Sequence, residues 1–247
     1  VAVLIFDDSE ARRLDAVRRD FVANISHELK TPIGALGLLS EAILGAKDQP
    51  DAVVKFASRM QLEAKRLTDL VQEIIDLSRL QSSDPLQKAI EVEVSDVVRE
   101  AVDQAQFSSE QRGIILEVGE IEDATVIGDR EQLITAVHNL IENAVNYSPE
   151  DTKVSIVTKR SGDLIEISVT DQGIGIAEPD LARVFERFYR VDPARSRLTG
   201  GTGLGLSIVK HIALNHGGDV KVWSKVGVGS TFTLLLPIAL IEEGVSK

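Results

Sequence analysis

The sequence contains no cysteine, and this absence removes three kinds of chemistry. Without thiols the chain has no disulfides, no thiolate metal ligands and no cysteine nucleophile. A cysteine-free sequence also fits a reducing compartment such as the cytoplasm, without establishing one.

Long apolar runs are missing as well, and basic residues are in the minority. No stretch approaches the ~20 apolar residues that a membrane-spanning helix needs. The 27 Lys and Arg residues stand against 39 Asp and Glu, which gives a formal net charge of -12. That balance argues against a surface built to bind nucleic acid or anionic lipid. A bound nucleotide would therefore have to be held by a few local groups.

The length and composition predict a globular chain of two domains. Of the 247 residues, 43% are apolar and 27% are charged, which is ordinary for a soluble fold. The first residue is Val1 rather than Met, so we expect a piece of a longer protein. Its opening stretch, VAVLIFDD, is typical of a strand that ends an upstream domain.

The first part of the sequence has the apolar spacing of two long helices. Apolar residues recur every three or four positions over 9–46, and a turn at 45–51 precedes a second such segment. The second segment has the spacing of a coiled-coil seam, at Met60, Ala64, Leu67, Val71 and Ile74. A lone helical hairpin leaves its seam uncovered, so we expect two copies to pair into a four-helix bundle.

A break at 81–85 (QSSDP) is the predicted domain boundary, and mixed α/β structure is expected beyond it. Strands are predicted at 89–94, 114–118, 124–129, 153–160, 163–171, 219–225 and 230–237. Helices are predicted from an N-cap at Ser95 to about Arg112, from Arg130 to about Asn146, and up to about 215–218. Strands follow one another too often for a doubly wound parallel sheet, so we expect an α/β sandwich.

Two glycine-rich stretches, 171–180 (DQGIGIAEPD) and 200–210 (GGTGLGLSIVK), raise the question of a phosphate loop. Neither stretch fits a dinucleotide fingerprint or a Walker loop, because Glu178 and Leu206 stand where a glycine and a lysine are needed. The first stretch does offer the acceptor carboxylate of Asp171 beside glycines that let a flat ligand approach. The second precedes a helix whose free N–H groups can face phosphates. Taken alone, the glycines fit a plain turn equally well.

Two further features have a functional and an ordinary interpretation. Asn139 and Asn143 are four residues apart and share a helical face. Such a pair can bind Mg²⁺ through its amide oxygens, but more commonly it is a pair of polar surface residues. Phe185 and Phe188 precede an Arg-rich run, which is either a mobile lid over a charged ligand or a solvated loop beside core aromatics.

The order of these features carries more weight than any one of them. His27-Glu28 comes first, then the asparagine pair, Asp171-x-Gly-x-Gly, Phe185-x-x-Phe and Gly-x-Gly-x-Gly. In this order, from about residue 21 to 237, the sequence resembles the sensor histidine kinases of two-component signalling. Within that family it looks most like the phosphate-responsive sensor kinases of actinobacteria.

The resemblance implies an α+β multidomain fold. Residues 1–20 would be the end of an upstream sensor domain and a signalling helix. Residues 21–84 would form the dimerisation and histidine-phosphotransfer domain, a helical hairpin that pairs into a dimeric four-helix bundle. Residues 85–247 would be the ATP-binding α/β sandwich shared with gyrase-type and chaperone-type ATPases. The chain would then be the cytoplasmic portion of a membrane-anchored protein, with membrane contact only through segments that precede it.

The resemblance also assigns the catalytic residues of the first domain. His27 would be the phosphoacceptor, and Glu28 would take or orient the proton on the other ring nitrogen, since a neutral imidazole is a competent nucleophile near pH 7. Thr31 would orient the water that removes phosphate from the partner. That partner would be the receiver domain of a response regulator, and the enzyme would act as kinase and phosphatase within a homodimer.

The implied cofactors of the second domain are ATP and Mg²⁺. Asn143 would be the Mg²⁺ ligand, and Asp171 would accept the adenine amino group. Asn146 departs from the family, where many relatives have a basic residue, and Arg187 or Arg190 would supply that phosphate contact. The lid would span 190–200. The full set of implied nucleotide-binding residues is Asn139, Asn143, Asn146, Tyr147, Asp171, Gly173, Gly175, Ile176, Arg187, Phe188, Arg190, Gly201, Thr202, Gly203, Leu204, Gly205 and Leu206.

Pro32 lies five positions after His27 in a segment predicted to be helical. Since proline has no N–H, the carbonyl of Glu28 loses its helical partner, and a bend is expected there. We therefore predict a hinge at Pro32 that lets an incoming signal reposition His27.

Two other classes of protein compete with this interpretation. A gyrase-like or chaperone-like ATPase would need a glutamate base where Asn139 stands. A catalytically inactive dimeric scaffold would not need His27, Asn143 and Asp171, which are all present.

Overall fold

The computed structural model describes residues 9–81, 86–192 and 201–239, with side chains in the first range from Val22 onward. Three predicted features fall on the remaining residues: the strand at 1–8, most of the break at 81–85 and most of the lid at 190–200. The chain divides into two compact units, Val1–Gln72 and Glu73–Lys247.

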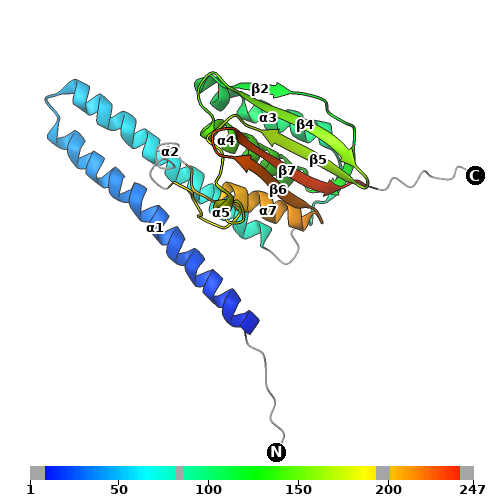
Figure 1. Ribbon diagram of the computed structural model, residues 1–247. Helices are drawn as coiled ribbons and strands as arrows, with labels where there is room; N and C mark the ends of the chain where they lie inside the picture. The colour runs from blue at the N-terminus through cyan, green and yellow to red at the C-terminus, as the bar shows by residue number, and fades with distance from the viewer. Residues whose placement is uncertain (1–8, 82–85, 193–200, 240–247) are drawn as a thin grey trace, which may run out of the picture. The chain divides into compact units, whose positions relative to one another are not determined.

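Two long helices make up the N-terminal part of the chain (Figure 1). They are α1 (Ser9–Gly45) and α2 (Pro50–Leu80), joined by a short turn, which confirms the predicted hairpin. Pro50 and Asp51 suit the start of α2, because proline is preset for the first helical position and an acidic side chain complements the helix dipole. Within the described residues, no helix is both long enough and apolar enough to cross a bilayer.

Pro32 lies inside α1, and the helix continues on both sides of it. The proline therefore does not end the helix. The bend and the signalling hinge predicted at this position stay predictions.

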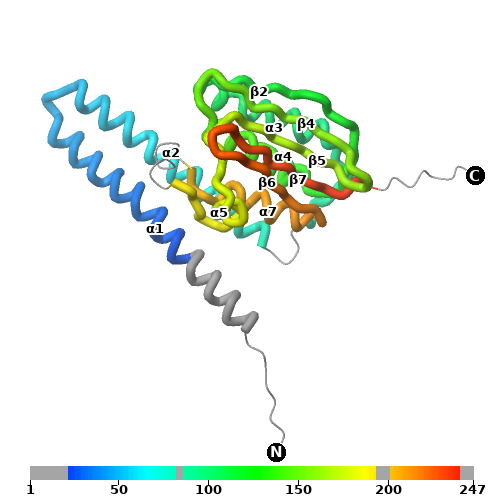
Figure 2. Tube along the Cα trace, in the orientation of Figure 1, coloured from blue at the N-terminus to red at the C-terminus, as the bar shows by residue number. Residues whose placement is uncertain are grey.

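The second unit contains a mixed five-stranded sheet and a small two-stranded one. The strands are β1 (Ile90–Glu93), β2 (Ile115–Val118), β3 (Thr125–Gly128), β4 (Lys153–Ser161), β5 (Leu164–Thr170), β6 (Asp219–Lys225) and β7 (Gly229–Pro237). The larger sheet has the order β2-β4-β5-β7-β6, so the last strand, β7, lies between β5 and β6 (Figure 2). Only β2 and β4 run parallel there, and the other neighbours are antiparallel.

A layer of helices covers one face of this sheet (Figure 1). It consists of α3 (Val94–Gln111), α4 (Arg130–Tyr147) and α7 (Gly205–Asn215), while the short α5 (Glu178–Leu181) follows β5. Alternate residues of β5, namely Ile165, Ile167 and Val169, are almost fully buried, as expected for a strand with one face in the core. The predicted α/β sandwich is therefore confirmed.

The start of α4 is fixed by two side chains. Asp129 caps the helix, since its Oδ1 accepts hydrogen bonds from the N–H groups of Glu131 and Gln132 at 3.0 and 3.2 Å. The N–H of Asp129 donates in turn to Nε2 of His216, 3.1 Å away, at the end of α7. Because a backbone N–H can only donate, Nε2 of His216 is the acceptor in this bond, and burial lowers the pKa of His216. These bonds tie α4 to α7.

The predicted N-cap of α3 at Ser95 is wrong. The helix begins at Val94, and its cap is Glu93, which makes no capping bond with its side chain. Val94 is almost fully buried, and its N–H donates to the carbonyl of Ala124 at 2.9 Å. A tertiary hydrogen bond therefore satisfies the first turn in place of a serine hydroxyl.

Candidate functional site

The second unit contains a cavity of about 190 Å³ that is bounded by α4, the end of β5 and the start of α7. Thirteen of the predicted nucleotide-binding residues line it: Asn139, Asn143, Asn146, Tyr147, Asp171, Gly175, Ile176, Arg190, Gly201, Thr202, Gly203, Gly205 and Leu206. Three segments that are far apart in the sequence therefore line the same cavity.

Asp171 provides a buried carboxylate in the wall of this cavity. It follows β5 directly and is 5% exposed. Its Oδ1 accepts hydrogen bonds from the N–H of Gly173 at 2.7 Å and of Ser230 at 3.1 Å. Burial raises the pKa of the Asp171 carboxyl, and these hydrogen bonds oppose the rise. The carboxylate is thus fixed in position and suited to accept a hydrogen bond from a ligand N–H group.

Glycine is required at two places beside the cavity. Gly175 has a φ of +70°, and a Cβ there would lie 2.1 Å from the carbonyl oxygen of Lys225. Gly203 has a φ of +78°, and its Cβ would lie 2.9 Å from the backbone of Phe188. Phe188 itself has a φ of 61°, and its N–H donates to Gly203 O at 2.8 Å. A positive φ at a non-glycine residue costs about 1 kcal/mol or more, which these close contacts must offset.

The polar face of α4 is the opposite wall. Asn139, Asn143, Asn146 and Tyr147 all come from this helix. The helix α7 begins close to it, since a Cβ added to Gly205 would lie 3.4 Å from Asn139 Oδ1. The N-terminus of α7, which is the positive end of the helix dipole, therefore lies beside the amide group of Asn139. This arrangement suits an anionic ligand.

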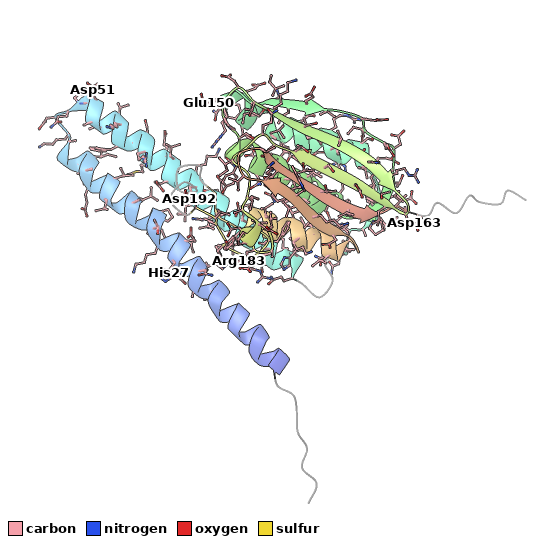
Figure 3. The ribbon with its side chains drawn as sticks, in the orientation of Figure 1. His27, Asp51, Glu150, Asp163, Arg183 and Asp192 are labelled. Atoms are coloured by element: carbon pink, nitrogen blue, oxygen red, sulfur yellow. The ribbon has the colours of Figure 1, made fainter. Side chains whose placement is uncertain are left out.

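His27 lies on α1 in the other unit and is exposed (Figure 3). Thr31, one turn further along, donates a hydrogen bond from Oγ1 to the carbonyl oxygen of His27 at 3.3 Å. Glu28 is half-buried. An exposed imidazole on a helix is accessible to an incoming electrophile, which a nucleophilic histidine requires.

Comparison with known proteins accounts for both regions. Residues 17–83 match the His Kinase A (phospho-acceptor) domain, and residues 128–240 match the family described as histidine kinase-, DNA gyrase B-, and HSP90-like ATPase. The chain belongs to the sensor histidine kinases. The resemblance read from the sequence is thereby confirmed.

Three relatives illustrate the likeness. The sensor-like histidine kinase SenX3 of Mycolicibacterium smegmatis is 52% identical over 235 residues, covering 95% of this chain and 61% of SenX3. The phosphate regulon sensor protein PhoR of Pseudomonas aeruginosa is 33% identical over 246 residues, covering 99% of this chain and 56% of PhoR. The solved structure of full-length ShkA in complex with AMPPNP has a TM-score of 0.64 at 26% identity, covering 89% of this chain and 46% of ShkA. The chain thus spans only about three fifths of SenX3 and of PhoR.

Four predicted nucleotide-binding residues of this sensor histidine kinase do not line the cavity: Gly173, Arg187, Phe188 and Leu204. Gly173 and Phe188 act through their backbones, as described above. Leu204 is fully buried, and its N–H donates to Thr202 Oγ1 at 3.2 Å. Arg187 points to α7, where its Nη2 lies 2.9 Å from Nε2 of His211.

Several residues that line the cavity were not predicted from the sequence. They are Glu73, Glu142, Ile174, Val184, Tyr189, Val191, Asp192 and Ser230. Glu142 lies three residues after Asn139 in α4, so it shares the helical face on which the asparagines were identified. Tyr189 is held from two sides, because its hydroxyl donates to Asp180 at 2.5 Å and the Arg183 guanidinium lies 4.1 Å from its ring centroid. No pattern in the sequence around Ser230 predicts that this residue lines the cavity.

The residues present fit a nucleotide with Mg²⁺. Among the described residues, no group of three or more His, Cys, Asp or Glu side chains is placed to hold a metal ion. Mg²⁺ does not need such a group, since it usually keeps several waters and binds one or two protein oxygens together with substrate phosphates. An amide oxygen on α4, such as that of Asn143, would supply one such protein ligand if phosphates lay at the N-terminus of α7.

Proposed function

We propose that this sensor histidine kinase transfers the γ-phosphoryl group of ATP to its own His27. The observation that carries the proposal is the cavity itself, where the fixed Asp171 carboxylate, the amide groups of α4 and the N-terminus of α7 meet. The adenine amino group would donate to Asp171, and the phosphates would lie at α7. Bound Mg²⁺ would neutralise phosphate charge from the side of Asn143.

The chemistry at His27 follows from the imidazole. Its unprotonated ring nitrogen attacks phosphorus while the bond to the ADP oxygen breaks, and Glu28 stabilises the proton on the other nitrogen. Most of the rate enhancement would come from positioning and charge stabilisation. The match of residues 17–83 to phospho-acceptor domains supports His27 as the acceptor.

The proposal extends to the partners. An aspartate on a response-regulator receiver domain would take the phosphoryl group from His27, and the complete protein would be membrane-anchored through segments outside this chain. The name of PhoR refers to a phosphate regulon, which supports a phosphate-responsive system.

We also propose that the helical hairpin pairs with a second copy in a four-helix bundle. In the single chain Val71 of the predicted seam is 42% exposed, and three apolar side chains of α1, those of Ile33, Leu38 and Leu44, are 55%, 70% and 74% exposed. Burying such side chains stabilises by about 1.5–3 kcal/mol each, which favours dimerisation. The predicted division into 1–20, 21–84 and 85–247 belongs to the same proposal.

Incubation of the chain with γ-labelled ATP and Mg²⁺ tests the proposed activity. Label on the protein that is acid-labile and alkali-stable means phosphohistidine. Release of free phosphate without labelling would instead show an ATPase of the gyrase or chaperone kind. Neither label nor phosphate release would show a scaffold.

Arg190→Ala is expected to weaken binding of a non-hydrolysable ATP analogue. Arg190 lines the cavity, and a lost charge-assisted hydrogen bond to phosphate costs roughly tenfold to a hundredfold in affinity. Isothermal titration calorimetry measures the affinity of each variant for the analogue. Arg187→Ala is the matched control and should stay near wild type, because that guanidinium points to His211. A larger loss in the control than in Arg190→Ala would move the phosphate contact to Arg187.

Thr31→Ala is expected to separate kinase from phosphatase activity. The hydroxyl has no part in the attack of His27 on ATP, but the water that attacks the regulator's phosphoaspartate needs a fixed hydrogen-bond partner. The variant should label itself normally and transfer to the regulator, while the phosphorylated regulator survives longer in its presence. Equal dephosphorylation rates for both proteins, measured with ADP, would refute the role of Thr31.

A further inference from the structure

Tyr189 is attached to its own segment through both its hydroxyl group and its ring. The hydroxyl donates to Oδ1 of Asp180 on α5 at 2.5 Å, and the guanidinium carbon of Arg183 lies 4.1 Å from the ring centroid. The first contact is a charge-assisted hydrogen bond and the second is a cation–π contact. Tyr189 lines the cavity, whereas Asp180 and Arg183 are not among its lining residues. The Tyr189 side chain therefore connects α5 to the cavity wall.

The carboxylate that Tyr189 reaches is itself held in place by the backbone. The N–H of Asp180 donates to the carbonyl oxygen of Ala177 at 2.9 Å, and the carbonyl oxygen of Asp180 accepts from Arg183 and Val184 at 2.9 and 3.0 Å. Val184 is buried and lines the cavity. Asp180 is thus part of a turn that is packed against the protein core.

The backbone just before Tyr189 has a conformation that needs support. Phe188 has a φ of 61°, which a non-glycine residue keeps only when the surrounding contacts compensate. The N–H of Phe188 donates to Gly203 O at 2.8 Å, and the bond from Tyr189 to Asp180 follows one residue later. Arg190, which lines the cavity, comes directly after this turn. The position of Arg190 therefore depends on the bonds made at residues 188 and 189.

We propose that Tyr189 is a positioning residue for Arg190, and that its bond to Asp180 holds the Arg190 guanidinium where the phosphates of a nucleotide bind. The inference rests on the proposed function, in which ATP occupies the cavity and Arg190 contacts phosphate. A tyrosine hydroxyl has one proton, and that of Tyr189 is donated to Asp180. This bond also raises the pKa of Tyr189, so the hydroxyl stays protonated near neutral pH. The proton is not available to a phosphate oxygen, and the hydroxyl acts through Arg190.

The test compares a non-hydrolysable ATP analogue with adenosine, because only the analogue has the phosphates that Arg190 would bind. Both affinities are measured for the wild type and for Tyr189→Phe, which removes the hydroxyl and keeps the ring beside Arg183. The variant should lose about fivefold in affinity for the analogue. Its affinity for adenosine should stay within about twofold of wild type.

Substitutions at Asp180 test the same bond from its other end, at a residue that does not line the cavity. Asp180→Ala removes the acceptor and should reproduce the loss seen in Tyr189→Phe, and it tests the inference even if Tyr189→Phe fails to fold. Asp180→Asn is the matched control, because it removes the charge but keeps an oxygen that accepts from the hydroxyl. It should bind the analogue within about twofold of wild type.

Combination with Arg190→Ala identifies the residue through which Tyr189 acts. Arg190→Ala alone weakens the analogue, as expected above for a lost phosphate contact. Adding Tyr189→Phe to Arg190→Ala should cause no further loss, because the guanidinium that the hydroxyl positions is no longer present. Two independent contributions would instead multiply.

The outcomes are separable. If Tyr189→Phe weakens the analogue and adenosine equally, the hydroxyl is merely structural and the inference is overturned. A full further loss on the Arg190→Ala background also overturns it, because the hydroxyl then acts without Arg190. If the wild type binds neither ligand, the proposed function fails together with the inference. Binding by the wild type with unchanged analogue affinity in Tyr189→Phe and Asp180→Ala overturns the inference alone.

Discussion

His27→Gln is expected to abolish labelling by γ-labelled ATP while leaving nucleotide affinity unchanged. The glutamine side chain is polar and suits a helix, but its amide nitrogen is not a nucleophile at neutral pH. The residues that line the nucleotide cavity all lie at position 73 or beyond, so binding of an ATP analogue should remain within about twofold of wild type.

The matched control for this variant is His211→Gln. His211 lies on α7 and contacts Arg187 and the carbonyl of Ser207, but it does not line the cavity. The His211→Gln variant should therefore autophosphorylate as the wild type does. Acid-labile label that persists in His27→Gln would show that the wrong histidine was assigned.

Asp171→Asn is expected to weaken binding of a non-hydrolysable ATP analogue by roughly tenfold to a hundredfold. The asparagine Oδ1 can still accept from the N–H groups of Gly173 and Ser230, so the local fold should persist. The amide NH₂, however, replaces a charged acceptor and presents a donor to the adenine amino group. The loss should therefore appear in affinity and not in thermal stability.

Asp163→Asn provides the control for a general effect of removing a carboxylate. Asp163 lies in the turn between β4 and β5 (Figure 3), and it is not among the residues that line the cavity. Calorimetric titration of both variants and the wild type gives the comparison. Binding by Asp171→Asn within about twofold of wild type would remove Asp171 from the site.

Local sequence signals were sufficient for most of the fold and for the centre of the site. The helix predicted from Arg130 runs from Arg130 to Tyr147. The signals that specify it are local, because Asp129 directly precedes the helix as its cap and the regular apolar spacing lies within the helix itself. The placement of Asp171 at the end of an alternating strand is also a local feature, and the structure has it there.

What the sequence did not reveal depends on contacts between distant segments. Ser230 reaches Asp171 because β7 pairs with β5, and no pattern around either residue specifies that pairing. The same holds for Val94, whose bond to Ala124 replaces the predicted cap at Ser95. The direction in which Arg187 points is set by His211 on a later helix. Side-chain direction and strand pairing are tertiary properties.

Mapping of the phosphorylated residue tests the central claim most directly. The chain is incubated with ATP and Mg²⁺, digested at alkaline pH to preserve phosphohistidine, and analysed by fragmentation mass spectrometry. The account predicts a phosphoryl group on the peptide that contains His27. Phosphate on His138, His211 or His216, or on no histidine although ATP is bound, would contradict it.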